Sequence, residues 1–253
     1  MTSDNLMKPV KIGILGLGTV GGGTASVLER NSAEISRRAG REIELVAASV
    51  RDINKKRSDT LKHVKLTLDS NEIVDNPDID IILELIGGTD EAKQLVMRAI
   101  NNGKHVVTAN KALIALHGNE IFAQAQRQGV TVAFEAAVAG GIPIIKAIRE
   151  GLAGNQIHWL AGIINGTGNF ILTEMRDKGR DFAGVLKEAQ ALGYAEADPT
   201  FDVEGIDAAH KLTILASIAF GVPLQFDKVY TEGISTIQQV DVEYAAELGY
   251  RIK

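Results

Sequence analysis

A run of acidic side chains followed by one lysine is the feature of this sequence best suited to chemistry. Residues 194–220 carry, in order, Glu196, Asp198, Asp202, Glu204, Asp207 and Lys211. Asp207 and Lys211 are four residues apart, so they share one face of a helix. Ile214 and Ile218 continue that face, which indicates a buried helix with the charged pair at its start, in a cleft. A buried lysine can be tuned for proton transfer while a neighbouring carboxylate holds it in place.

Other interpretations of this segment stay open. Asp207 and Lys211 could form a surface ion pair, which stabilises a helix by only about 0.2–0.5 kcal/mol. Asp202 could be the N-cap of a helix that begins at Val203, because aspartate is a preferred N-cap residue. A carboxylate cluster beside one lysine also suits a substrate with an ammonium group. The carboxylates would bind the ammonium group, and Lys211 would act on a nearby oxygen.

A glycine-rich turn near the N-terminus could hold a dinucleotide. The turn is a GxGxxG pattern, Gly16, Leu17, Gly18, Thr19, Val20 and Gly21. It follows a predicted strand and opens a predicted helix, as this motif requires. Gly16 would make the tight turn, Gly18 would admit the pyrophosphate, and Gly21 would let helix and strand pack closely. The alternative is a glycine-rich turn without a ligand.

The end of the second predicted strand bears on the choice between NAD and NADP. An acidic residue there would bind the ribose 2′-hydroxyl group of NAD, whereas an arginine would receive the 2′-phosphate of NADP. Ser49 and Arg51 favour NADP, and the basic residues 55–57 add positive charge nearby. Asp52 could still serve NAD. A solvated basic loop without a cofactor role is the alternative.

The elements that must position these groups alternate between strands and helices. Strands are expected at 11–15, 43–50, 65–68, 79–86, 104–109 and 130–134, with helices ending at residue 30 and spanning 91–101 and 112–128. This spacing predicts an α/β fold with a doubly wound parallel sheet of the Rossmann type. A glycine-rich stretch then changes the character of the chain. We therefore expect a cofactor domain at 1–140 and a catalytic domain at 141–253.

The second domain is expected to be smaller, of α+β type and incomplete. A helix at 142–151 and a strand at 156–164 should precede a mostly helical stretch that runs to Phe220. The final residues, AAELGYRIK, end where a strand would begin. This favours a chain that is truncated at its C-terminus.

Composition argues against several classes of function. The chain has 253 residues, 45% hydrophobic and 23% charged, which is typical of globular proteins. A net charge of -5 argues against a nucleic-acid partner. The absence of cysteine excludes disulfides and thiolate chemistry, and the five histidines show no metal-binding spacing. No apolar run long enough for a membrane and no signal-like segment predict a cytoplasmic protein without a membrane partner.

Several motifs occur together with the glycine turn. They are TANKALIA (108–115), FEAAVAGGIP (134–143), NGTGNFIL (165–172) and GYAEADP…D…D…K (193–211). This combination resembles the homoserine dehydrogenase family over essentially the whole chain. The resemblance implies NAD(P)H-dependent interconversion of aspartate 4-semialdehyde and homoserine, on the route to threonine and methionine. It also implies a homodimer, and a longer chain that often carries a C-terminal ACT domain.

The resemblance assigns roles to the substrate-binding and catalytic residues. Lys211 matches the proton donor to the carbonyl oxygen, and Asp207 matches its acidic partner. Glu196 matches a ligand of the substrate amino group, and Asp202 another acidic residue of the site. Thr167, in NGTGN, could cap a helix, or the N–H groups of its turn could hold the substrate carboxylate.

The resemblance also assigns residues to the cofactor. Gly88 and Thr89 match the segment at the nicotinamide end. Lys111, in TANK, matches a lysine near the nicotinamide and the substrate. On its own Lys111 could be a solvent-facing residue, but it follows the carboxyl end of a parallel strand, where such folds bind ligands.

A monovalent-cation site is the last feature that the resemblance implies. Its residues match Glu135, Val138, Gly140 and Ile142, with backbone carbonyls as most of the ligands. Such hard oxygen ligands suit sodium or potassium better than zinc. Glu135 alone would be read as a surface carboxylate.

We therefore expect a homoserine dehydrogenase in which Lys211 stabilises and protonates the carbonyl oxygen as hydride reaches the carbon. Another NAD(P)-dependent oxidoreductase of an amino acid or a sugar is the first alternative. A catalytically silent nucleotide-binding fragment is the second.

Overall fold

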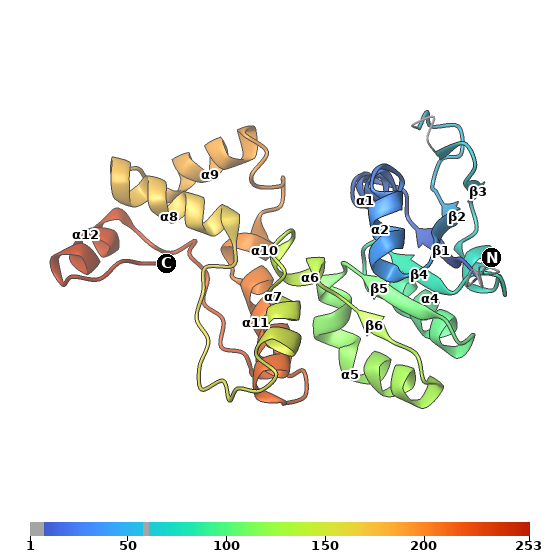
Figure 1. Ribbon diagram of the computed structural model, residues 1–253. Helices are drawn as coiled ribbons and strands as arrows, with labels where there is room; N and C mark the ends of the chain where they lie inside the picture. Colours follow the sequence, from blue (N-terminus) through green and yellow to red (C-terminus); the bar gives the residue numbers. More distant parts are fainter. Residues whose placement is uncertain (1–7, 58–60) are drawn as a thin grey trace. The chain divides into compact units, whose positions relative to one another are not determined.

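Parallel strands joined by helices build the N-terminal part of the chain (Figure 1). The computed structural model describes residues 8–57 and 61–253, and the chain divides into two units, Met1–Pro143 and Ile144–Lys253. The division falls close to the boundary expected at residue 140. The assignment of a cofactor domain and a catalytic domain to these parts stays a prediction.

The sheet of the first unit has six strands in the order β3-β2-β1-β4-β5-β6, and every neighbouring pair is parallel. The strands are β1 (Val10–Leu15), β2 (Ile43–Ser49), β3 (Lys65–Thr67), β4 (Ile81–Glu84), β5 (His105–Thr108) and β6 (Val132–Ala133). The predicted doubly wound sheet is confirmed. The run at 79–86 forms a shorter strand than expected.

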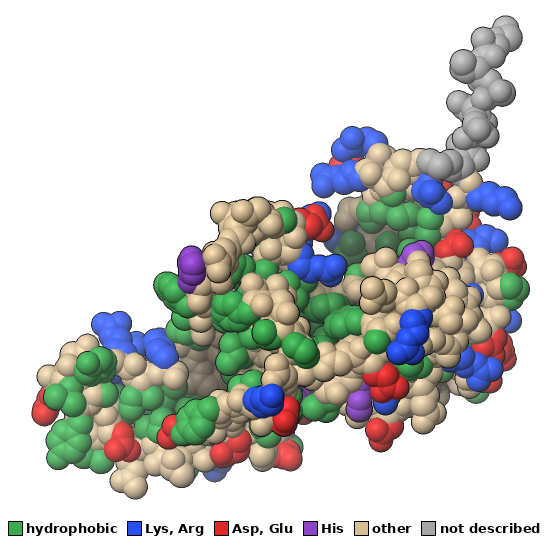
Figure 2. Space-filling view, turned by 90° about the horizontal axis from the view of Figure 1, so that it is seen from below, with side chains coloured by type: hydrophobic (Ala, Val, Ile, Leu, Met, Phe, Trp, Pro, Cys, Tyr) green, Lys and Arg blue, Asp and Glu red, His purple; other side chains and the backbone are tan. Residues whose placement is uncertain are grey.

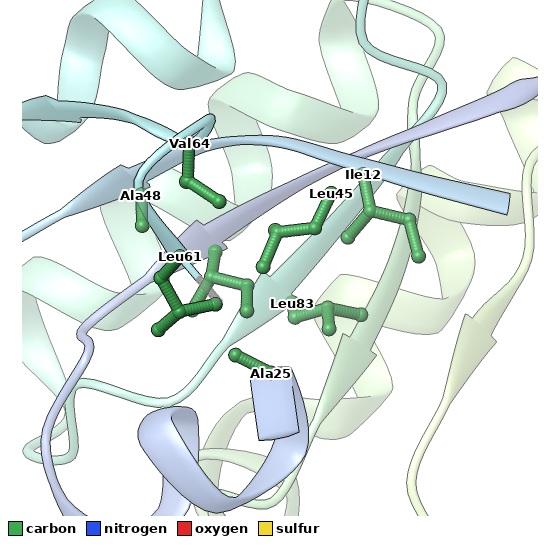
Figure 3. Packing of buried hydrophobic residues seen from close by; sticks show 8 residues of the cluster. Ile12, Ala25, Leu45, Ala48, Leu61, Val64 and Leu83 are labelled. Atoms are coloured by element: carbon green, nitrogen blue, oxygen red, sulfur yellow. The ribbon is translucent and has the colours of Figure 1, made fainter. Parts of the chain in front are cut away.

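Helices cover both faces of this sheet. They are α1 (Thr19–Arg30), α2 (Ser32–Ala39), α3 (Ser70–Val74), α4 (Asp90–Asn101), α5 (Lys111–Gln128) and α6 (Ala136–Ala139). Figure 1 shows α1 and α2 on one side of the sheet and α4 and α5 on the other. Because both faces are covered, the central strands are apolar on both faces. In Figure 3, Ala25 of α1 lies against a cluster of strand and loop side chains, Ile12, Leu45, Ala48, Leu61, Val64 and Leu83.

The carboxyl ends of the four central strands lie in register. Leu15 of β1 is paired with Ser49 of β2 and with Glu84 of β4, and Glu84 is paired with Thr108 of β5. Every loop that follows these strands therefore starts from one edge of the sheet. The strand order reverses between β1 and β4, which is the point where open parallel sheets bind ligands.

The turn from β1 into α1 depends on two glycines. Gly16 has a φ of 91°, a left-handed conformation that glycine adopts freely. A Cβ atom on Gly21 would lie 2.0 Å from the Gly16 carbonyl oxygen, whereas one on Gly18 would meet nothing within 4 Å. Gly21 thus permits the close packing of helix on turn that the motif predicts, and Gly18 leaves the surface of the turn open.

The second unit is built from helices. They are α7 (Ile144–Lys146), continued by a π-helical turn (Ala147–Gly151), α8 (Gly166–Lys178), α9 (Phe182–Ala191), α10 (Thr200–Val203), α11 (Ile206–Phe220), a 3₁₀ turn (Phe226–Lys228) and α12 (Gln239–Glu247). Buried residues of α8, α9, α10 and α12 share one cluster, Ile171, Met175, Val185, Val203 and Val242. Tyr244, Leu248 and Tyr250 are exposed near the C-terminal end. Figure 2 shows hydrophobic side chains (green) among the polar ones on the surface.

Two expectations for the second unit were wrong. Residues 156–164 form no strand, and no strand occurs within residues 144–253. An isolated extended segment has no ladder partner for its N–H and C=O groups, so it does not become a strand by its apolar pattern alone. The last residues of AAELGYRIK, 250–253, where a strand was expected to begin, form neither a strand nor a helix.

Gly21→Ala should destabilise the first unit, since its methyl group would have to displace the backbone oxygen of Gly16. Overpacking of this kind costs about 1–3 kcal/mol. Gly23→Ala is the matched control in the same helix, because a Cβ atom there meets nothing within 4 Å, and alanine favours a helix by about 1 kcal/mol over glycine. Urea unfolding should give opposite shifts of the midpoint. Equal midpoints for the two variants would contradict the close-packing role.

Candidate active site

The predicted pair Asp207 and Lys211 lies at the start of α11, directly after its N-cap Gly205. Lys211 Nζ donates to Asp207 Oδ2 over 2.7 Å and to the Ile164 carbonyl oxygen over 2.6 Å. The Asp207 side chain is 7% exposed and that of Lys211 17%. The surface ion pair considered from the sequence is therefore ruled out. This is a nearly buried pair with its ammonium group held by two oxygens.

Asn165 joins this pair to a second carboxylate. Its Nδ2 atom donates to Asp202 Oδ1 over 2.8 Å and to Asp207 Oδ2 over 3.0 Å. Its Oδ1 atom accepts from the amide of Gly168 over 2.7 Å, so that Asn165 is also the N-cap of α8. The start of α8, the short helix α10 and the start of α11 thus meet at one side chain.

The expected cap at Asp202 is wrong. Asp202 lies inside α10, whose N-cap is Pro199, and α11 begins after Gly205. The short helix exists because Gly205 takes a φ of 78°, which breaks the chain into two helices. The Asp202 carboxylate accepts a hydrogen bond from the Asn165 side chain and does not cap a helix.

The other predicted substrate residues and their neighbours differ in exposure. Thr167 is buried, and its hydroxyl group donates to the Tyr194 carbonyl oxygen over 2.6 Å, which ties the start of α8 to the acidic segment. Thr167 does not cap the helix, since Asn165 does. Glu196 is exposed. Hydrogen bonds from the hydroxyl and amide groups of Thr200 hold the pKa of the exposed Asp198 carboxyl below its usual value.

In the first unit, the glycine turn is tied to the end of β2. Ser49 is 4% exposed, and its hydroxyl group accepts from the amide of Gly16 over 3.3 Å and from the hydroxyl group of Ser70 over 2.9 Å. Ser49 therefore supports the turn. Gly18, Thr19 and Val20 are exposed at the start of α1, which has no side-chain cap, so the first amides of this helix can face an anion.

Arg51 and its neighbours occupy the loop after β2. Arg51 is exposed and makes no hydrogen bond or ion pair with any described residue. Arg57 instead donates to the carbonyl oxygens of Asp52 and Lys55, over 2.7 and 2.8 Å. The Asp52 carboxylate accepts from the amide of Asn54 over 2.8 Å. Of the Arg51, Asp52 and Arg57 side chains, that of Arg51 is the one without such a bond among the described residues.

A buried carboxylate connects the next two loops of the same edge. Glu84 is 0% exposed, and it accepts from the Thr108 hydroxyl group over 2.5 Å and from the amide of Ile86 over 3.1 Å. Thr108 Oγ1 accepts in turn from the amide of Asn110 over 2.9 Å. Thr108, from the TANKALIA motif, is thus held by hydrogen bonds to the Glu84 carboxylate and from the Asn110 amide.

Asn110 completes this connection. Its Oδ1 atom caps α5 by accepting from Leu113, and its Nδ2 atom donates to the Gly88 carbonyl oxygen over 2.6 Å. The segment Gly88–Thr89, with Thr89 as the N-cap of α4, is therefore tied to the start of α5. Lys111 is the first residue of α5 and is half-buried at that edge.

The segment expected to bind a cation surrounds α6. Glu135 precedes this helix and is half-buried, Val138 is buried, and Ile142 is 65% exposed. Gly140 has a φ of 58°, so the chain turns directly after the helix. No group of three or more His, Cys, Asp or Glu side chains in the described ranges could hold a metal ion. The donors of this segment are one carboxylate and backbone carbonyls, which fit a hard monovalent ion.

Asn165, Glu84 and Asn110 were not predicted as site residues. Asn165 and Asn110 lie close in the sequence to the predicted Thr167 and Lys111, but each also bonds a group that is distant along the chain. A sequence signal existed for the two asparagines, because asparagine is a preferred N-cap residue before a helix. No local pattern distinguishes Glu84, which reads as the polar end of an apolar strand.

A parallel sheet in this order, with a glycine turn at its reversal point, defines a dinucleotide-binding oxidoreductase class. The model of the homoserine dehydrogenase NAD-binding domain matches residues 16–135, and that of homoserine dehydrogenase matches residues 143–253. The chain belongs to the homoserine dehydrogenase family.

Individual relatives agree with this assignment. The homoserine dehydrogenase of Pseudomonas aeruginosa is 71% identical over 98% of this chain and 56% of its own length. A crystal structure of the Thiobacillus denitrificans enzyme is 67% identical, with a TM-score of 0.93, over 98% of this chain and 57% of its own. A hyperthermophilic archaeal homoserine dehydrogenase in complex with NADPH is 29% identical, with a TM-score of 0.77, over 91% and 75%. The chain thus spans little more than half the length of the Pseudomonas and Thiobacillus enzymes.

Proposed function

We propose that this chain supplies the cofactor-binding and catalytic residues of a homoserine dehydrogenase. The reaction is the NADP(H)-dependent interconversion of aspartate 4-semialdehyde and homoserine, on the route to threonine and methionine. The observation that carries the proposal is the nearly buried ammonium group of Lys211, held by Asp207 and the Ile164 carbonyl oxygen. The names of the relatives support the choice of substrate.

The hydrogen bonds of Lys211 suggest its role. A lysine ammonium group has three protons, and Asp207 and Ile164 accept two of them. The third proton is left for the substrate oxygen. When bound, the nicotinamide cofactor supplies the hydride. Lys211 stabilises the negative charge that develops on the carbonyl oxygen and gives it the proton, and it recovers the proton when homoserine is oxidised.

The carboxylates would bind the other end of the substrate. Glu196 is exposed and has room to meet the substrate ammonium group, with Asp202 beside it in the same segment. The amides of the turn around Thr167 would hold the substrate carboxylate. In the first unit, the edge that carries Gly18, Thr89 and Lys111 would receive the cofactor.

Three features of the whole protein belong to the same proposal. They are a homodimer, a cytoplasmic location and the absence of a nucleic-acid or membrane partner. The net charge of -5 supports the absence of a nucleic-acid partner. None of the helices in the described residues combines the length and the apolar character that crossing a membrane requires.

Homoserine-dependent reduction of NADP by the full-length protein tests the proposal. Reduction with another amino acid or a sugar, but not with homoserine, would favour a different oxidoreductase. Cofactor binding without turnover of any of these would favour a silent nucleotide-binding module.

Arg51→Ala should weaken NADP binding and leave NAD binding nearly unchanged, because the 2′-phosphate loses its cationic partner. A hydrogen bond to a charged group contributes about 1.5–3 kcal/mol, or roughly tenfold or more in Kd. Arg41→Ala, at the exposed opposite end of β2, is the matched control. Titration of both cofactors measures the effect, and equal losses for NAD and NADP would remove Arg51 from the site.

Sodium or potassium should raise the melting temperature and the activity at fixed ionic strength, relative to a bulky organic cation. The donors of Glu135, Val138, Gly140 and Ile142 would hold the ion, so Glu135→Gln should reduce the difference. Glu91→Gln, an exposed change on α4, should not. Identical behaviour in all three salts would count against the cation site.

Lys211→Ala should lower kcat by roughly 10²–10⁴-fold, as expected for loss of a general acid, with NADP affinity nearly unchanged. Because the single change removes the cationic partner of the nearly buried Asp207, Lys211→Met combined with Asp207→Asn separates loss of catalysis from loss of folding. Lys187→Ala, an exposed lysine of α9, is the control. Glu196→Ala should instead mainly raise KM for homoserine. Near-normal kcat in a folded Lys211→Ala protein would make Lys111 the better candidate for the acid.

A further inference from the structure

The orientation of the Asn165 amide is determined by its own hydrogen bonds. The amide of Gly168 donates to one end of the group, so that end must be the oxygen. The nitrogen end then faces Asp202 and Asp207, over 2.8 and 3.0 Å, and each of its two protons has a carboxylate acceptor. Asn165 therefore caps α8 with its side-chain oxygen, and both protons of its neutral side-chain nitrogen are donated to carboxylates.

Two carboxylates that accept from one nitrogen atom are close together, so a shared donor between them offsets their mutual repulsion. Three other ionisable side chains lie on α11 or directly after α10. Lys211 of α11 bonds Asp207. Glu204, the C-cap of α10, accepts from Ser235, and the His210 ring packs against Phe201 and Phe226. Asp202 thus has Asn165 as its only hydrogen-bond donor among the described side chains.

We propose that Asn165 is a positioning residue whose amide nitrogen holds the Asp202 and Asp207 carboxylates side by side, so that Asp207 can hold the Lys211 ammonium group toward the substrate. The inference rests on the proposed role of Lys211. It adds a function to the asparagine of NGTGN that a helix cap alone does not have. A cap needs only the oxygen, whereas this role needs the nitrogen.

Asn165→Asp separates these two functions in the full-length protein. Aspartate is as good an N-cap as asparagine, so the start of α8 keeps its acceptor. The donor becomes a third carboxylate, whose pKa two neighbouring carboxylates raise above the value of about 3.9 in the unfolded chain. Its penalty on stability is therefore absent below about pH 4 and grows as the pH rises toward the folded-state pKa.

Urea midpoints at pH 5 and pH 8 measure this penalty. The deficit of Asn165→Asp relative to the unchanged protein should be larger at pH 8. Asp181→Asn is the matched control, because Asp181 caps α9 through Gly184 in the same way at an exposed position. Its difference from the unchanged protein should be small and similar at both pH values. A deficit of Asn165→Asp that is equal at pH 5 and pH 8 would overturn the proposal.

Asn165→Ser provides a second, neutral variant, which keeps a capping oxygen and lacks the donor nitrogen. It should lower kcat by roughly tenfold to a hundredfold, as when outer partners that orient functional ligands are removed, while Kd for NADP stays unchanged. A kcat within about twofold of the unchanged protein would overturn the positioning role. If the unchanged full-length protein does not oxidise homoserine, the proposed function fails, and the urea midpoints still decide whether the Asn165 amide nitrogen holds the two carboxylates together.

Discussion

A carboxylate removed from water must be compensated, and the compensation of Asp207 organises the second unit. Lys211 and Asn165 both donate to the same oxygen of this side chain. Removing one partner of a buried ion pair typically costs about 3–5 kcal/mol, so the groups around Asp207 are held together strongly. The Ile164 carbonyl oxygen accepts from Lys211, Asn165 caps α8, and Asp202 and Asp207 lie on either side of the break between α10 and α11, so one set of contacts links all these elements.

Glu84 imposes the same constraint on the first unit, with neutral donors. A hydroxyl group and a backbone amide compensate it, and the hydroxyl group belongs to Thr108 of the neighbouring strand. Since Asn110 extends the connection to Gly88, the burial of one carboxylate sets the course of two loops at the carboxyl edge. In both units, a buried carboxylate thus fixes the conformation of the loops that carry the proposed site residues.

Predictions from local sequence patterns succeeded where the residues of the pattern themselves determine the structure. An apolar run such as 79–86 between helices implies a covered parallel strand, and the spacing from Gly16 to Gly21 implies a close contact that the structure contains. Residues 156–164 show the limit, because their pattern is compatible with a strand but a strand also needs a partner. Ser49 shows another limit, since its hydroxyl group turned out to serve the glycine turn.

The sequence by itself determined the α/β class, the family resemblance and the pairing of Asp207 with Lys211, because each depends on residues that are close in the chain or on motifs in a fixed order. Only the tertiary structure decided that the pair is nearly buried, that Asp202 is no helix cap, and that Asn165 binds both acids. The physical reason is distance along the chain. Asn165 is 37 and 42 residues from its two carboxylates, and such contacts form only when packing brings separate helices together.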